Sequence, residues 1–359
     1  MNDQASPKLK AVSRAKHQIL ERYFPAWAKI LGSTNLKLVY VDCFAGSGQY
    51  AQGEEGSPLV IIRKAREVVE KANGQFSILT IFVEKNAQAA SALQSHIPGD
   101  LPPSMEVRVL NRDAHDLVPE LLRALPIGMP AFFFIDPYGH PLTIPVMNNI
   151  LSQPKTEILL TFMWYAINMH LNNPKTDAAI TRMFGDAGWK TQLFMNMGGS
   201  ARESAFVQYF LSRLNAKYKL PFRIRFSPED KVPARERRTK YYLIHLSNHP
   251  KAVLLMKEVM WYLGDEMGTF DYSAMTQKRL FSQTPTTEEL SAYLDEHCSG
   301  KTLTFSQLRE ETWDLPFIEK HYREAVKRLE QCGKVQIVRC ESKRSGVKGR
   351  DKIIFLGRQ

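Results

Sequence analysis

Residues 36–50, LKLVYVDCFAGSGQY, combine a short apolar stretch, an acidic residue and a loop with two glycines. The apolar part is rich in residues that favour β-structure, which predicts a buried strand ending at Asp42. Gly46 and Gly48 allow backbone conformations and close approaches to a ligand that other residues resist. Pro58 suits the first turn of a helix. The stretch therefore predicts a strand, a ligand-facing loop and a helix in succession.

The same strand-and-helix unit recurs along the next part of the chain. After a first amphipathic helix at 7–31, strand-like stretches occupy 77–83, 106–110, 131–135 and 158–162, and helical patterns occupy 58–72, 86–96 and 115–124. Strands that alternate with helices predict a parallel sheet covered on both faces. Two later strands, 222–226 and 241–247, predict a hairpin that ends the sheet with a reversed strand. Such a hairpin is typical of methyltransferase sheets and unusual in NAD-binding sheets.

Acidic residues stand at the ends of four successive predicted strands. They are Asp42, Glu84, Asp113 and Asp136. Ligands of open α/β sheets bind beyond the carboxyl ends of the strands, where the strand order reverses. We therefore expect these four carboxylates to surround one site.

The first three of these residues indicate a cofactor that contains a nucleoside. The carboxylate of Glu84 can accept hydrogen bonds from both ribose hydroxyls, and Asp113 can accept one from an adenine amino group. No P-loop lysine follows the glycine loop, which argues against nucleoside triphosphates. The sequence predicts S-adenosylmethionine, bound by Asp42, Phe44, Ala45, Gly46, Gly48, Glu84 and Asp113. A tight turn with solvated loop carboxylates is the alternative interpretation.

The stretch FFFIDPYG, residues 132–139, carries an acid, a proline and an aromatic residue to the same edge of the sheet. In methyl transfer the cofactor supplies the electrophile, and the enzyme mainly positions and desolvates the acceptor. Asp136 and the Pro137 carbonyl can accept N–H bonds from an amine, and Tyr138 can stack on its ring, so these three are the predicted catalytic residues. Nucleic-acid amino-methyltransferases usually have a second proline at this position. This chain has only one, and the difference weakens the case for an amine as the methyl acceptor. A proline turn that closes the strand is the alternative.

The composition bounds the class of protein and its partners. The 359 residues carry a formal net charge of +11, which favours a polyanionic partner such as nucleic acid. The four cysteines match no metal-binding spacing, so no metal site is predicted. The first residues are polar, and no apolar stretch is long enough to cross a bilayer, so we expect no membrane segment and a cytoplasmic location.

The last part of the chain reads as a separate small domain. Residues 266–285 are the predicted linker between a first domain, 1–265, and a second, 286–359. Three helices followed by two strands in the second domain predict a winged helix-turn-helix. The loop between its strands, RCESKRSGVKGRDK, carries the predicted nucleic-acid-binding residues Lys343, Arg344, Lys348 and Arg350. Docking of another protein is the alternative use of this domain.

With these motifs in place, the chain resembles the three-Cys-motif partner family of bacterial proteins over roughly residues 10–265. The matching residues are Lys16-His17 with Tyr23 and Trp27, VDCFAGSGQY (41–50), GSPL (56–59), FIDPYG (134–139), Met256-Lys257 and Met260-Trp261. The resemblance implies a Rossmann-like class I methyltransferase fold with an attached winged helix. It implies cofactor positions at Asp42, Gly46, Gly48, Glu84 and Asp113, and a catalytic-site position at Asp136. It also implies a partner protein with three cysteines, phage-like and related to radical S-adenosylmethionine enzymes.

The sequence leaves competing functions open. One is an S-adenosylmethionine-dependent methyltransferase that acts on nucleic acid or on a target associated with it, and Glu84 and Asp113 favour this function. The other is a non-catalytic cofactor fold that docks its partner while the winged helix binds DNA, and the altered Asp-Pro-Tyr-Gly motif favours it. A third, an NAD oxidoreductase, is disfavoured because the first loop lacks the full GxGxxG pattern.

Overall fold

The computed structural model describes residues 11–137, 139, 141–226, 239–264, 271–272, 286–340 and 346–357. The chain divides into two compact units, Met1–His249 with Asp271–Thr276, and Pro250–Phe270 with Gln277–Gln359. Residues 250–263, which the sequence analysis assigns to the first domain, belong to the second unit in this division.

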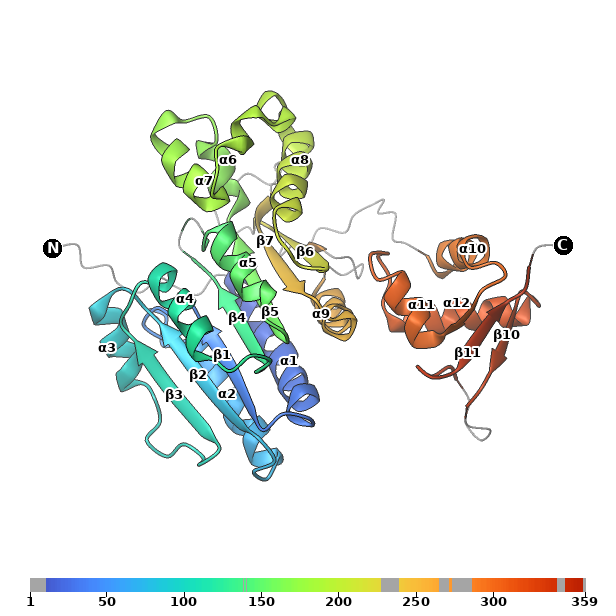
Figure 1. Ribbon diagram of the computed structural model, residues 1–359, viewed down its shortest axis with the longest axis horizontal. Helices are drawn as coiled ribbons and strands as arrows, with labels where there is room; N and C mark the ends of the chain where they lie inside the picture. Colours follow the sequence, from blue (N-terminus) through green and yellow to red (C-terminus); the bar gives the residue numbers. More distant parts are fainter. Residues whose placement is uncertain are drawn as a thin grey trace. The chain divides into compact units, whose positions relative to one another are not determined.

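The first unit is built on a sheet with the strand order β3-β2-β1-β4-β5-β7-β6-β8 (Figure 1). The strands are β1 (Lys37–Asp42), β2 (Ser77–Val83), β3 (Met105–Leu110), β4 (Ala131–Ile135), β5 (Thr156–Phe162), β6 (Tyr218–Arg225), β7 (Thr239–Ser247) and β8 (Asp271–Tyr272). Strands β1 to β5 pair in parallel, whereas β7 runs antiparallel to both β5 and β6. The reversed β7 forms the expected hairpin with β6, but the hairpin does not end the sheet, because the two-residue β8 pairs in parallel with β6. The predicted Rossmann-like sheet, with five parallel strands followed by a reversed strand, is confirmed.

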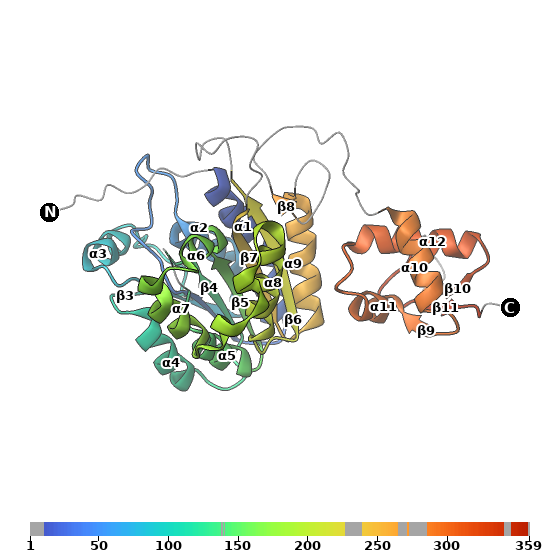
Figure 2. The same ribbon diagram turned by 90° about the horizontal axis from the view of Figure 1, so that it is seen from above.

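Helices cover both faces of this sheet. They include α1 (Ala11–Gly32) and α2 (Ser57–Lys71) on one face and α4 (Ala114–Ala124) and α5 (Ile144–Ser152) on the other, as Figure 2 shows; α3 (Ala87–Ser95) connects β2 to β3. Val39 and Val41 lie in the core that includes residues of α4 and α5. Tyr40, between them, packs edge-on against Phe24 of α1 at a centroid distance of 5.6 Å. Burial on both faces explains why these strands are apolar throughout.

The segment after β5 forms short helices. They are α6 (Trp164–His170), α7 (Asp177–Phe184) and α8 (Gly199–Ser212), with 3-10 turns at Pro174–Thr176, Gly188–Thr191 and Leu193–Asn196. Phe206 of α8 packs against Trp164, Phe184 and Phe194 at centroid distances of 5.3, 5.8 and 4.9 Å. This aromatic cluster joins the segment to the core of the sheet.

The second unit contains α9 (Pro250–Leu263) and the winged-helix elements. These elements are α10 (Thr287–His297), β9 (Thr302–Thr304), α11 (Phe305–Glu311), α12 (Glu319–Gln331), β10 (Val335–Val338) and β11 (Lys352–Phe355). Capping boxes begin two of the helices, at Thr286 with Glu289 and at Thr304 with Gln307. The expected two strands are joined by a third, because β9 pairs with β11.

The described residues meet neither the requirements of a membrane-spanning helix nor those of a metal site. None of the helices that the structure describes is both long and apolar enough to span a membrane. Within the same residues, no group of three or more His, Cys, Asp or Glu side chains is placed to hold a metal ion.

Candidate functional site

A cavity of about 610 Å³ opens in the first unit, at the carboxyl ends of the parallel strands. Its wall consists of Ser13 and Lys16 of α1, residues 44–50 after β1, Gly56 and Ser57, Asp136, Pro137 and Gly139 after β4, Met163 after β5, and Lys240 and Tyr241 of β7. Strand β7 contributes its beginning because it runs opposite to β5. The cavity lies where β1 and β4 adjoin and the strand order reverses, which is the ligand site of open α/β sheets.

The glycine loop after β1 forms one wall of the cavity. Gly46 has φ +65°, and a Cβ atom added there would meet no atom within 4 Å, so this position offers open space to a ligand. Gly56 donates its amide to the Gly48 carbonyl at 2.7 Å, and a Cβ atom on Gly56 would lie only 2.8 Å from that oxygen. Glycine is therefore required at position 56 for the loop to close on itself.

Asp42 holds this loop from behind. Its side chain is fully buried and accepts hydrogen bonds from the Ser57 hydroxyl at 2.8 Å and the Phe44 amide at 3.1 Å. Burial raises the pKa of Asp42 to about 7, although the two hydrogen bonds act in the opposite direction. Asp42 does not line the cavity, whereas the predicted cofactor residues Phe44, Ala45, Gly46 and Gly48 do.

Glu84 and Asp113 lie outside the cavity wall. Glu84 accepts a hydrogen bond from the amide of Gly46 at 2.9 Å. It therefore contacts a residue of the cavity wall without lining the cavity itself. Its other oxygen accepts the amide of Asn86 at 2.7 Å. Asp113 caps α4 through the amide of His115, and its ion pair with Lys85, together with this hydrogen bond, lowers its pKa. The structure brings Glu84 next to the glycine loop and gives Asp113 a capping role.

Asp136 faces the cavity and forms an ion pair with Lys16. The two side chains are only 21% and 12% exposed, and the Lys16 ammonium lies 5.8 Å from the centroid of the Tyr241 ring. Pro137 also lines the cavity, while Tyr138, the third predicted catalytic residue, lies outside the described residues. Sequence reasoning did not propose Lys16 as a site residue. In the sequence, Lys16 is singled out only as part of the Lys16-His17 pair that matches the three-Cys-motif partner family.

A buried polar cluster fixes α1 over the site. Tyr23 of α1 donates its hydroxyl to Glu157 of β5, and His245 of β7 lies 3.0 Å from the same carboxylate oxygen and 3.3 Å from the Tyr23 hydroxyl. Burial, with Glu157 next in effect, holds the pKa of Tyr23 well above its usual value, so the hydroxyl keeps its proton. These contacts anchor the helix that carries Lys16 to two strands of the sheet.

The predicted nucleic-acid residues divide into two groups. Lys343 and Arg344 lie outside the described residues. Lys348 and Arg350 stand in the loop before β11, where the Lys348 amide donates to Asp351 at 2.7 Å and Arg350 is exposed. The structure therefore places the described pair on a loop that leads into a strand of the wing.

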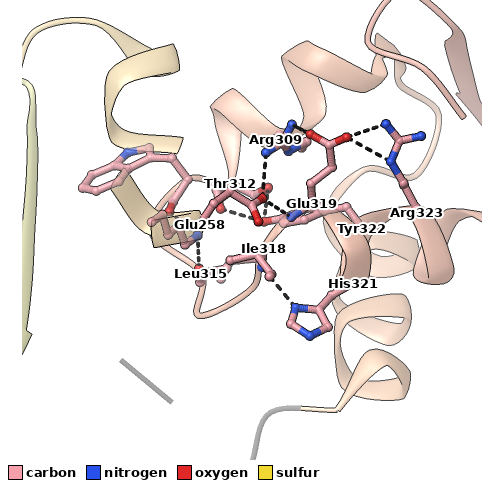
Figure 3. A network of polar contacts seen from close by, with 11 residues as sticks. Glu258, Arg309, Thr312, Leu315, Ile318, Glu319, His321, Tyr322 and Arg323 are labelled. Carbon is pink, nitrogen blue, oxygen red and sulfur yellow. Dashed lines mark hydrogen bonds and ion pairs between the residues drawn. The ribbon is translucent and has the colours of Figure 1, made fainter. Parts of the chain in front are cut away.

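The arginines around α12, the second helix of the helix-turn-helix, have acidic partners. Arg323 and Arg309 both pair with Glu319, and Arg328 pairs with Glu288 (Figure 3 shows the Glu319 pairs). These contacts neutralise much of the positive charge that the sequence places on this helix.

Helix α9 covers the beginning of α12 (Figure 3). Glu258 of α9 accepts the amide of Glu319 at 2.8 Å, which satisfies a free donor at the helix N-terminus. Lys257, also of α9, donates to the carbonyl oxygens of Trp313, at 2.6 Å, and Leu315. Burial lowers the pKa of Lys257 to about 7. The end of α12 that winged helices turn toward a DNA groove is thus occupied by this chain's own helix.

Comparison with known proteins supports the C-terminal assignment. Residues 269–342 match the family described as the GMT-like wHTH domain, so the winged helix-turn-helix expected from the sequence is confirmed. No curated protein matches the chain.

Solved structures provide distant matches. The protein LPL1258 from Legionella pneumophila is 13% identical, with a TM-score of 0.40 over 70% of this chain and 92% of its own. Magnesium protoporphyrin IX methyltransferase from Synechocystis, solved with bound SAH, is 12% identical, with a TM-score of 0.32 over 68% and 90%. Human methyltransferase-like protein 13, in complex with SAH, is 10% identical, with a TM-score of 0.33 over 79% and 100%.

Proposed function

We propose that the first unit binds S-adenosylmethionine in the cavity and transfers the methyl group to an amine of nucleic acid or of a target associated with it. The observation that carries this proposal is the open glycine loop opposite Asp136. Gly46 leaves room for a ligand, Glu84 holds its amide from behind, and Asp136 faces the same space. A volume of about 610 Å³ lies within the range of small-molecule sites.

The proposed chemistry assigns the chain a positioning role. The bound cofactor would supply a methyl group on a positively charged sulfur; the amine nitrogen forms the new bond to carbon as the carbon–sulfur bond breaks and its electrons stay on sulfur. Asp136 and the Pro137 carbonyl orient the amine by accepting its N–H groups, and the Asp136 carboxylate takes up the released proton.

Calorimetric titration with S-adenosylmethionine, S-adenosylhomocysteine and NAD tests the cofactor. We expect S-adenosylmethionine and S-adenosylhomocysteine to bind with dissociation constants in the micromolar range, and we expect NAD not to bind. Glu84→Ala should weaken binding by about tenfold or more, because it removes the charge-assisted hydrogen bond that holds the Gly46 amide of the glycine loop, and such a bond contributes roughly 1.5–3 kcal/mol. Glu106→Ala, on β3, is the matched control. No heat with S-adenosylmethionine, and no effect of Glu84→Ala, would remove the cofactor from the proposal.

A second candidate function is a non-catalytic module that docks a partner protein. It is favoured by the Lys16 ion pair, which already occupies the Asp136 carboxylate. The proposed partner is the three-Cys-motif protein implied by the family resemblance, with the winged helix binding DNA. Co-purification with that protein, together with no binding of S-adenosylmethionine, would favour this function over methyl transfer.

A further inference from the structure

The ion pair between Lys16 and Asp136 constrains what the cavity accepts. The two residues lie 120 positions apart in the chain and meet at the cavity wall, where both side chains are largely buried. The neighbouring His17 is held neutral, because burial lowers its pKa to about 4 with a further contribution from the Lys16 charge. Asp136 and Lys16 therefore present one anionic hydrogen-bond acceptor beside one cationic donor to a ligand in the cavity.

A ligand that reaches Asp136 has to separate this pair. Each charged group, once separated, needs a new hydrogen-bond partner, because a buried charged group left without one is strongly disfavoured. An acceptor molecule with an amine alone would satisfy Asp136 and leave Lys16 without its partner. A molecule with a donor directly beside an acceptor satisfies both at once.

We infer that the acceptor of the methyl group is the pairing edge of adenine or cytosine, at which an exocyclic amine adjoins a ring nitrogen that accepts a hydrogen bond, in a strand of nucleic acid. The amine donates to Asp136, and the ring nitrogen accepts from Lys16. This inference rests on the proposed methyl transfer and narrows its substrate. It makes Lys16 a substrate-binding residue.

Other bases fit the pair less well. Guanine carries a ring N–H beside its amine on the pairing edge, so a donor would face the Lys16 ammonium. Thymine has no exocyclic amine to receive the methyl group. The aromatic rings in the wall, Phe44, Tyr50 and Tyr241, suit a flat base, and the net charge of +11 suits a strand of phosphates. A primary amide of a protein also offers a donor beside an acceptor, so it is an outcome that the test has to separate.

The experiment measures binding of fluorescein-labelled single-stranded oligothymidine with one central adenine, 1-deazaadenine, cytosine or 3-deazacytosine. Each deaza base keeps the amine and loses the ring acceptor of the pairing edge. Anisotropy is recorded with the full chain in saturating S-adenosylhomocysteine. We expect adenine or cytosine to bind roughly 10- to 100-fold more tightly than its deaza counterpart, the range for one hydrogen bond to a charged group. Lys16→Met should abolish that difference, whereas Lys29→Met, an exposed position of the same helix, should preserve it.

Equal affinity for all oligonucleotides, no binding of any of them, or a base preference unchanged in Lys16→Met would overturn the inference. Competition by a glutamine-containing peptide, with no preference among bases, would overturn it in favour of a protein amide. A parallel calorimetric titration with S-adenosylhomocysteine separates the two proposals. If the cofactor binds and no base preference is seen, methyl transfer stands and recognition of the nucleobase edge is removed. If a base preference is seen and the cofactor does not bind, recognition of the edge stands and methyl transfer is removed.

Discussion

The cavity of the first unit and the winged helix of the second unit both carry charged residues at the positions predicted to bind a ligand, yet the two regions use charge differently. In the cavity, Lys16 and Asp136 neutralise each other at the wall of an open space, where a ligand can take the place of either. In the winged helix, Arg323 and Arg328 pair with acidic neighbours, and Glu258 covers the start of α12. Charge on a helix indicates a binding surface only when nearby residues of the same fold leave it available.

The largest expected effect is at Asp136. Asp136→Ala should lower methyl transfer by about 10²- to 10⁴-fold, the range for a group that moves a proton, while cofactor affinity changes only a few-fold. Transfer from a labelled methyl donor and calorimetry measure the two quantities. Asp116→Ala, an exposed position on α4, is the control. Equal activity of wild type and variant would remove Asp136 from the mechanism and weaken the contrast between the two regions.

Asp42→Asn probes the buried charge behind the cavity. In the folded chain the pKa of Asp42 is about 7, above its usual value of 3.8. Between pH 3.8 and about 7, Asp42 is therefore protonated in the folded chain and ionised in the unfolded chain. This group's stabilisation is therefore complete at low pH and is lost as pH rises through about 7, on the order of 4 kcal/mol. Urea unfolding at several pH values should show the variant gaining stability relative to wild type as pH rises. Parallel profiles would mean that Asp42 titrates normally.

The smallest expected effect concerns the wing. Replacing Lys343, Arg344, Lys348 and Arg350 with Ala should weaken binding of duplex DNA and reduce its salt dependence, by about 0.9 in the logarithmic slope per lost phosphate contact. Arg328→Ala should leave the slope unchanged, because Arg328 pairs with Glu288. Anisotropy across a salt series measures both. If the chain ignores DNA at low salt yet captures a protein, the domain is a docking module.

The sequence predicted the sheet more completely than the helices around it. Strands β2 and β4 have the predicted bounds, 77–83 and 131–135, because each is a short apolar stretch bounded by polar residues. Helix α5 was missed, since its nine residues follow a proline-containing loop and are too few to establish a helical period. Strand β9 was missed because it has three residues and is recognisable only by its pairing with β11.

The site was predicted in part, and the gaps have a common physical cause. Local signals identify the glycine loop and the acidic strand ends, because these lie next to their own strands. Lys16 is distant from Asp136 in sequence, and its position within an amphipathic helix does not reveal the pairing. The contact between Glu258 and the start of α12 likewise joins residues 61 positions apart. Contacts of this kind depend on the tertiary fold, and a single sequence carries no pattern for them.

The anchor of α1 has a consequence for how the protein forms during its synthesis. Tyr23 leaves the ribosome early, but its partners Glu157 and His245 follow 134 and 222 residues later. The helix that carries Lys16 therefore cannot reach its final seat until nearly the whole sheet has been made. Contacts between such distant residues close late and slowly. A nascent chain stalled before β7 would contain every predicted cofactor residue and still lack a finished cavity.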